Sequence, residues 1–153
     1  MQLTAVHPTK NAISVEAVAI GIFENDKGLV VSSSLLSGAE RKEVTQKLLD
    51  KEFKGGKAET LTLRTRAAEA AEAVWAAGLG KREKFTPEVA RKFGAALLKK
   101  AKAEKWVTVR VDAEPILAAA GPAGIQALAE GILLADYRFD RYFSKKKNSN
   151  PVV

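Results

Sequence analysis

The segment that most constrains the fold is an uncharged apolar run near the start of the chain, from Ala17 to Phe23. Its length is typical of a β-strand, and it lacks the alternation of apolar and polar residues that marks a strand with one face in water. A strand of this kind needs cover on both faces, which helices provide in α/β proteins. The run therefore predicts a sheet that lies between two layers of helices.

Several segments later in the chain also have strand patterns. Residues 59–65 alternate, with Leu61 and Leu63 on one face and threonines on the other, as expected for a half-exposed edge strand. Residues 73–79 follow a segment rich in alanine and glutamate, which favours helix, but they are apolar and run into glycines, and we interpret them as a buried strand. The expected strands are 14–23, 29–31, 59–65, 73–79 and 106–111, the last with Val107, Val109 and Val111 on one face.

Capping signals mark the starts of amphipathic helices. Ser37 and Glu40 form the pattern of a capping box, in which each side chain accepts a hydrogen bond from the backbone N–H of the other residue. Thr86 is a good N-cap before Pro87, and Gly121–Pro122 marks a further start. The expected helices begin at 38, 87 and 122; the first ends near Lys51 and the last reaches Tyr142. The inner stripe of the first is Val44 and Leu48, that of the second is Val89, Phe93 and Leu97, and that of the third is Ile125, Leu128, Ile132 and Phe139.

The alternation of strands and helices predicts a three-layer α/β/α sandwich with a mixed, mostly parallel sheet. A length of 153 residues suits one domain, which we place at residues 1–144, and residues 145–153 are expected to form a polar, basic exit or linker. Residues 1–10 lack the apolar core of a secretory signal, and the run 17–23 is far shorter than the roughly 20 residues of a membrane span. We therefore expect no membrane partner.

Residue types that build catalytic sites are scarce. The chain has no cysteine and one histidine, His7, in the segment before Pro8. A zinc site needs several ligands, and a nucleophile among Ser32–Ser34 would need a histidine base. The glutamates that lie among lysines, arginines and alanines have the spacing of solvated helix faces: Glu40, Glu43, Glu69 and Glu72. We expect no catalytic residue, metal-binding residue or cofactor in this chain.

A glycine-containing turn is a candidate phosphate site. Gly78-Leu-Gly80-Lys81 follows a predicted strand, and the backbone N–H groups of such a turn can cradle a phosphate. The turn lacks the third glycine of the dinucleotide-binding motif and the Gly-Lys-Ser/Thr of a P-loop, so a purely structural turn is the alternative.

Lysines form a second candidate site. Lys99 and Lys102 lie on the outer face of the helix that starts at Pro87, and Lys145, Lys146 and Lys147 follow the last helix. With a net charge of +7, these lysines are candidates for binding DNA or another polyanion. The alternatives are a charged surface that keeps the protein soluble and lysines that favour a helix C-terminus through its dipole.

The final predicted helix carries a resemblance to a known family. Residues 126–142, Gln-Ala-Leu-Ala-Glu-Gly-Ile-Leu-Leu-Ala-Asp-Tyr-Arg-Phe-Asp-Arg-Tyr, with the lysines 145–147 after them, resemble the end of the N-terminal domain in cytosolic leucine aminopeptidases. That family shows an Ala-Leu-x-Glu-Gly helix ending in Tyr-x-Phe-Asp-x-Tyr. Weaker similarities follow the family's order at 50–56 leading into Glu59-Thr-Leu, at 77–81 and at 86–91, and the whole resemblance covers about Ser14 to Lys147.

The resemblance implies a macro-domain-like fold and a cytoplasmic protein. In this family a larger C-terminal domain holds two divalent metals, zinc or manganese, and releases N-terminal amino acids from peptides. Its signature, Asn-Thr-Asp-Ala-Glu-Gly-Arg-Leu, is absent here. The implied partners of this chain are such a catalytic domain and further copies in a homo-oligomer, and some bacterial members also bind DNA.

The favoured hypothesis is thus a non-catalytic N-terminal domain of a metal-dependent aminopeptidase, a hydrolase, that acts in assembly and active-site access. Two alternatives stay open. One is a DNA- or polyanion-binding module that uses Lys99, Lys102 and Lys145–Lys147. The other is a nucleotide- or ADP-ribose-binding module that uses Gly78, Gly80 and Lys81.

Overall fold

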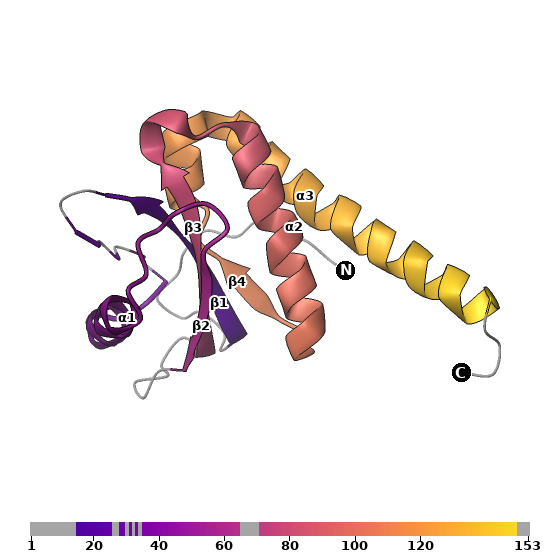
Figure 1. Ribbon diagram of the computed structural model, residues 1–153, viewed down its shortest axis with the longest axis horizontal. Coiled ribbons are helices and arrows are strands. Elements are labelled where there is room, and N and C mark those ends of the chain that lie inside the picture. The colour runs from indigo at the N-terminus through magenta and orange to yellow at the C-terminus, as the bar shows by residue number, and fades with distance from the viewer. Residues whose placement is uncertain are drawn as a thin grey trace.

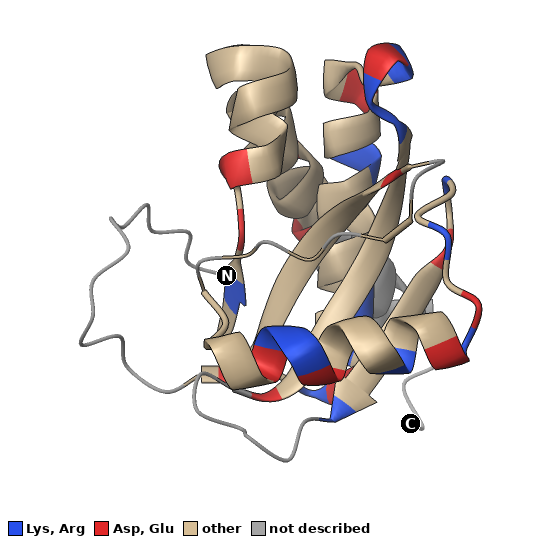
Figure 2. Ribbon diagram, turned by 90° about the vertical axis from the view of Figure 1, so that its left-hand side faces the viewer, with Lys and Arg blue, Asp and Glu red and all other residues tan. Residues whose placement is uncertain are grey.

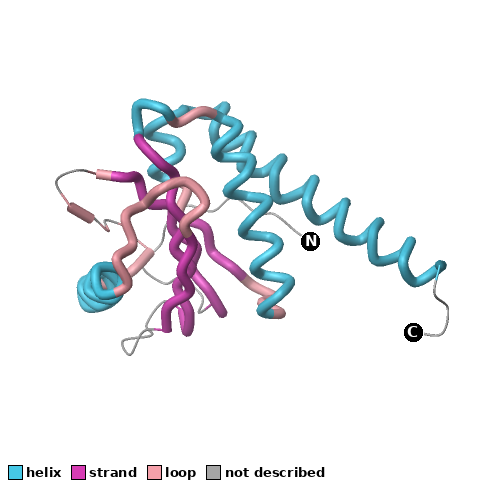
Figure 3. The backbone as a smooth tube through the Cα atoms, in the orientation of Figure 1, coloured by secondary structure: helices cyan, strands magenta, loops and turns pink. Residues whose placement is uncertain are grey.

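One sheet of four strands occurs among the residues that the computed structural model describes, which are 15–25, 28–29, 31, 33, 35–64 and 71–149 (Figures 1 and 3). The strand order is β2-β3-β1-β4, with β1 (Val15–Glu24) and β3 (Ala71–Lys81) in the centre and β2 (Thr60–Arg64) and β4 (Val109–Val111) at the edges. β1 pairs in parallel with β3 and β4, whereas β2 runs antiparallel to β3. The predicted mixed, mostly parallel sheet is confirmed.

Helices cover both faces of this sheet. α1 (Gly38–Asp50) lies against one face, and α2 (Pro87–Glu104) and α3 (Glu114–Ser149) cover the other (Figure 1). A short 3-10 helix, η1 (Arg82–Lys84), leads from β3 towards α2. The predicted three-layer α/β/α sandwich is confirmed.

Side chains of β1 alternate between two apolar cores. Val18, Ile20 and Ile22 belong to the core on the α1 side, and Ala19 belongs to the core beneath α2 and α3. Ala17, Val18 and Ala19 are each 0% exposed. The prediction that this run is a strand covered on both faces is therefore confirmed.

The start of α1 carries the predicted capping box. The Ser37 hydroxyl accepts a hydrogen bond from the Glu40 N–H at 3.1 Å, and the Glu40 carboxylate accepts one from the Ser37 N–H at 3.0 Å. Glu40 is buried, so the prediction that it lies on a solvated helix face is wrong. The reciprocal pair gives a partner to a helix-end amide and to a buried carboxylate at once. Val44 and Leu48 face the core as predicted.

β3 is a strand, as the apolar residues 73–79 predict, and it is longer than predicted at both ends. It pairs with β1 on one side and β2 on the other. Trp75 is buried, with its ring centroid 5.6 Å from that of Phe93 on α2. The helix propensity of alanine and glutamate favours helix by only about 0.5 kcal/mol per residue. Strand pairing on both sides and burial of the side chains outweigh this preference.

α2 and α3 pack closely because two glycines lie at their contact. A Cβ atom on Gly131 would lie 2.0 Å from the carbonyl oxygen of Arg91, and one on Gly94 would lie 2.4 Å from the carbonyl oxygen of Leu128. The helix interface is therefore too tight for any side chain at these two positions. Of the predicted inner stripes, Phe93, Leu97, Leu128 and Ile132 are buried here.

The helical path of α3 breaks at Gly121, whose backbone angles are φ 65° and ψ −160°. The predicted helix start at Gly121–Pro122 is thus the beginning of the longer segment of α3. The shorter helical segment before it, which begins at Glu114, was not predicted. The helix continues to Ser149, beyond the expected end at Tyr142, so Lys145–Lys147 lie on it. The side chain of Phe139 falls outside the described part of the chain.

The predicted strand 106–111 is too long, because β4 begins only at Val109. Lys105 ends α2 with a left-handed backbone (φ 60°), and the Trp106 N–H donates back into the last turn of that helix at 2.9 Å. The Val107 N–H donates to the Glu16 carboxylate at 3.1 Å, and the Val107 side chain is 87% exposed. Since these amides are used outside the sheet, the alternating pattern does not form a strand there.

Two further local predictions need correction. Leu29 and Val31 are not strand residues; they belong to a loop and pack their side chains against the α1-side core. Thr86 occupies the N-cap position of α2 as predicted, but its side chain makes no capping hydrogen bond.

One helical stretch, Glu114–Tyr137, is long and apolar enough to cross a membrane by length and composition. This stretch is longer than the apolar run 17–23, on which the expectation of no membrane partner was based. The core helix of a soluble protein passes the same test, and here Ile116, Leu128 and Ile132 of this stretch lie in the core beneath α2 and α3. Length and composition alone are weak grounds for placing it in a membrane.

Candidate functional site

A groove with a volume of about 750 Å³ lies on the outer side of α2 and α3. We call it the α2–α3 groove. Its lining residues are Glu88, Arg91, Lys92, Ala95, Ala96, Leu98, Lys99, Lys102, Gly131, Leu134 and Ala135.

The groove combines an apolar floor with a basic rim. Alanines and leucines from both helices form the floor, and Gly131 lies where the helix backbones come closest. The lining contains four basic residues and one carboxylate; the basic residues are Arg91, Lys92, Lys99 and Lys102, and the carboxylate is that of Glu88. The groove therefore offers an apolar surface inside a field of net positive charge.

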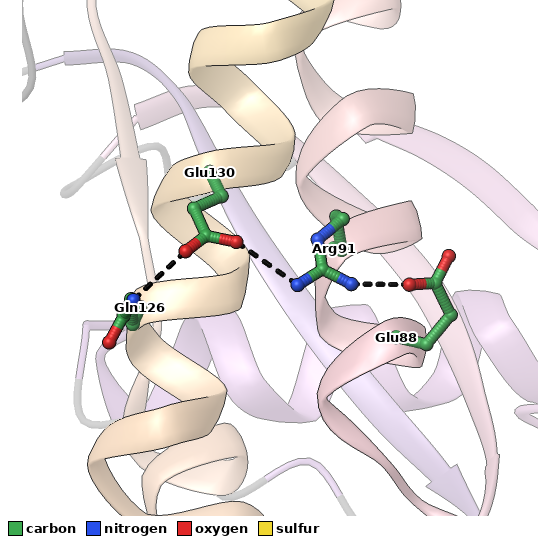
Figure 4. Close-up of polar contacts among 4 residues, drawn as sticks. All are labelled: Glu88, Arg91, Gln126 and Glu130. Atoms are coloured by element: carbon green, nitrogen blue, oxygen red, sulfur yellow. Dashed lines mark hydrogen bonds and ion pairs between the residues drawn. The ribbon is translucent and has the colours of Figure 1, made fainter.

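A polar network at one end of the groove ties α2 to α3 (Figure 4). The Arg91 guanidinium donates to Glu130 of α3 at 3.0 Å and also to Glu88 on its own helix. Gln126 donates to the second oxygen of Glu130 at 2.9 Å. The hydrogen bond to Glu130, and then that to Glu88, raises the pKa of Arg91, and the hydrogen bonds from Gln126 and Arg91 lower the pKa of Glu130.

The remaining basic residues of the rim differ in their partners. Lys102 lies 3.3 Å from a carboxylate oxygen of Asp136, a nearly buried residue of α3. In the part of the chain that the structure describes, no ion pair joins Lys92 or Lys99 to a carboxylate. Among the described residues, these two lysines therefore carry the rim charge that has no carboxylate partner.

Lys99 and Lys102, two lysines of the predicted polyanion site, thus line one groove. Lys145, Lys146 and Lys147 lie further along α3, and their side chains fall outside the described residues. Arg91 and Lys92 also line this groove, although neither was predicted from the sequence. A signal for Lys92 was present, because residues seven apart on a helix share a face, as Lys92 and Lys99 do.

The predicted phosphate-binding turn is occupied by the protein's own backbone. The Gly78 N–H donates to the Glu59 carbonyl at 2.8 Å, and the Gly80 N–H donates to the Gly55 carbonyl at 2.9 Å. A Cβ atom on Gly78 would lie 2.0 Å from the Gly56 oxygen. These glycines allow β3 to pack against the Gly55–Gly56 loop, and neither amide is left to bind an anion. Lys81 is exposed beside them.

Catalytic donors do not gather anywhere in the described ranges. No group of three or more His, Cys, Asp or Glu side chains there could hold a metal ion. His7, Ser32 and Ser34 lie outside the described residues, and Ser33 is buried, where its hydroxyl accepts a hydrogen bond from the Leu35 N–H at 3.3 Å.

Comparison with known proteins gives consistent results. A family model described as "Cytosol aminopeptidase family, N-terminal domain" matches residues 19–146. The chain is 27% identical to a probable cytosol aminopeptidase of Sulfurihydrogenibium sp. over 146 residues, which cover 95% of this chain and 29% of that protein. It is 31% identical to the corresponding protein of Persephonella marina over 148 residues, again 95% of this chain and 29% of the relative.

The fold has a counterpart among solved structures. A variant of tomato leucine aminopeptidase superposes with a TM-score of 0.59 at 17% identity, over 84% of this chain and 26% of that one. The chain thus spans less than a third of the length of these proteins.

Proposed function

This chain belongs to the cytosol aminopeptidase family and corresponds to the family's N-terminal domain. We propose that it is the non-catalytic part of a metal-dependent aminopeptidase. In that role it would act in assembly and in access to the active sites. The longer protein would be a cytoplasmic hydrolase that releases N-terminal amino acids from peptides. The relatives are named probable cytosol aminopeptidases, which supports a cytoplasmic location.

The donor chemistry supports a catalytic centre elsewhere. Two divalent metals need several carboxylate or imidazole ligands that converge within a few ångströms. The described ranges hold no such group, so they do not fit the dimetal site of the family. The relatives are about three times as long as this chain, and the ligands would belong to that additional length.

The single observation that carries the proposed role in assembly is the form of α3. This helix extends well past the sheet (Figure 1) and ends at Ser149. Leu133 is 50% exposed and Tyr137 is 61% exposed on it. A projecting helix with exposed large apolar side chains supports contact with a further folded unit or a further copy.

Hydrolysis of Leu-p-nitroanilide tests the catalytic half of the proposal. We expect no turnover by the pure chain with added manganese or zinc, and turnover by the full reading frame that contains it, assayed side by side. Metal-dependent hydrolysis by the 153-residue chain alone, abolished by a chelator, would contradict the proposal.

Light scattering tests the assembly half. In the protein from the full reading frame, Leu133→Ser combined with Tyr137→Ser should lower the oligomeric mass or the apparent affinity for long peptide substrates. Leu49→Ser is the control, because Leu49 is a similarly exposed leucine (51%) on α1, on the opposite side of the sheet. An unchanged mass and unchanged kinetics in the double variant would contradict a role for this helix.

A further inference from the structure

We propose that the α2–α3 groove is a docking site for an acidic amphipathic α-helix of a partner protein. The proposal goes beyond the proposed function and does not depend on it. It rests on the shape of the groove, on the placement of its lysines and on the apolar side chains that border it.

The shape of the groove suits a helix. Ala95 and Ala96 lie on the open side of α2, between Lys92 and Lys99, and small side chains leave a furrow along the helix. Helices pack with their axes about 8–10 Å apart, and the closest approaches need small residues at the contact. Leu134 and Ala135 of α3 continue this apolar lining, whereas Leu98 of α2 is 1% exposed and adds little accessible surface.

The lysines set the charge pattern of the incoming helix. Lys92 and Lys99 are seven residues apart on one helix, which corresponds to about 10.5 Å along its axis at the usual rise of roughly 1.5 Å per residue. Carboxylates seven residues apart on a helix laid along α2 have the same spacing. Arg91 and Lys102 are already paired with Glu130 and Asp136, so their charges are partly compensated within the protein.

An apolar side chain at the border of the groove provides an anchor for the incoming helix. Leu134 lines the groove and is 48% exposed. A leucine at the edge of a pocket buries apolar area on binding.

The same features disfavour two other occupants. A second copy docked through the same face would bring lysines opposite lysines, which is repulsive. Duplex DNA would place phosphates against an apolar floor, while two of the four basic side chains already have carboxylate partners. An acidic helix, in contrast, matches both the apolar floor and the uncompensated lysines.

Two designed peptides provide the test. The acidic peptide has 21 residues, leucine and alanine on one face, and glutamates seven residues apart on both sides of that face; the basic peptide carries lysine at each glutamate position. Fluorescence anisotropy with the full 153-residue chain should show that the acidic peptide binds at least tenfold more tightly than the basic one. Equal affinity for the two peptides would overturn the proposal.

Paired charge reversals locate the binding site. Lys92→Glu with Lys99→Glu should weaken binding of the acidic peptide at least tenfold. Lys42→Glu with Lys51→Glu makes the same change in net charge at exposed positions of α1 and its C-cap, beyond the other face of the sheet, and should change affinity less than twofold. Equal weakening by both pairs would show a general charge effect and overturn the proposal.

A third variant separates docking from simple electrostatic attraction. Ala96→Arg adds a positive charge and a large side chain to the furrow, and arginine keeps a high helix propensity. We expect tenfold weaker binding of the acidic peptide. Stronger binding, or preferential binding of a 20-base-pair DNA duplex that the acidic peptide does not displace, would replace this proposal with a polyanion site.

Discussion

Single residues decide how α2 and α3 meet. Gly94 and Gly131 remove the side chains that would keep the two backbones apart, and Arg91 spans the contact to reach Glu130. The first effect is steric and works at the buried contact. The second is electrostatic and works at the edge, where water screens it, so the glycines should matter more to stability.

Gly131→Ala should destabilise the protein by about 2 kcal/mol or more, because the added Cβ would meet a backbone oxygen that cannot rotate away. Urea denaturation measures the change. Gly38→Ala is the matched control, since the nearest atom to its added Cβ is 4.0 Å away, and it should shift stability by less than about 0.5 kcal/mol. Equal effects of the two substitutions would contradict the steric argument.

Glu130 should contribute stability that depends on pH. Its pKa in the folded protein is lowered from the ordinary value of 4.5, so the contribution is present above that value and is lost as the pH falls through the folded-state pKa. Glu130→Gln should therefore lower the urea midpoint at pH 7, and the difference from the parent protein should shrink below pH 4.5. Glu83→Gln, at an exposed position of η1, controls for the change in net charge. A difference that stays constant with pH would argue against the Arg91–Glu130 interaction.

Individual elements differ in how well their sequences specify them. α1 was predictable at its start because Ser37 and Glu40 carry a complete local signal within four residues. β1 was predictable because seven uncharged apolar residues leave no exposed face. β4 was predicted too long because alternation of valines says nothing about where α2 ends or which amides are already bonded.

Ser37→Ala should destabilise the protein by about 1 kcal/mol, since it removes an N-cap hydrogen bond that the structure contains. Thr86→Ala removes the residue at the same position of α2, where no side-chain cap bond is formed, and should cost less than about 0.5 kcal/mol. Thermal or urea denaturation of both variants gives the comparison. A larger loss for the threonine variant would show that the two caps were assigned the wrong way round.

The whole molecule combines local order that the sequence specifies with a surface that it does not. The layers follow from the periodicity of the strands and helices. The groove does not follow from periodicity, because its lining combines Lys92 and Lys99 of α2 with Leu134 of α3. How these two helices cross depends on glycines whose role is visible only in three dimensions. Acidic and basic residues are mixed along α1 (Figure 2), whereas basic residues outnumber the single carboxylate in the lining of the groove.

The central position of β1 has a consequence for synthesis on the ribosome. β1 precedes the other described strands, and its two parallel neighbours are residues 71–81 and 109–111, so this pairing must wait until those residues have emerged. Non-local strand pairing is slow, and an apolar strand with open edges is prone to aggregate while it waits. A strand that is fully covered in the folded protein is thus exposed on the nascent chain until its neighbours emerge, and a chaperone is expected to bind there.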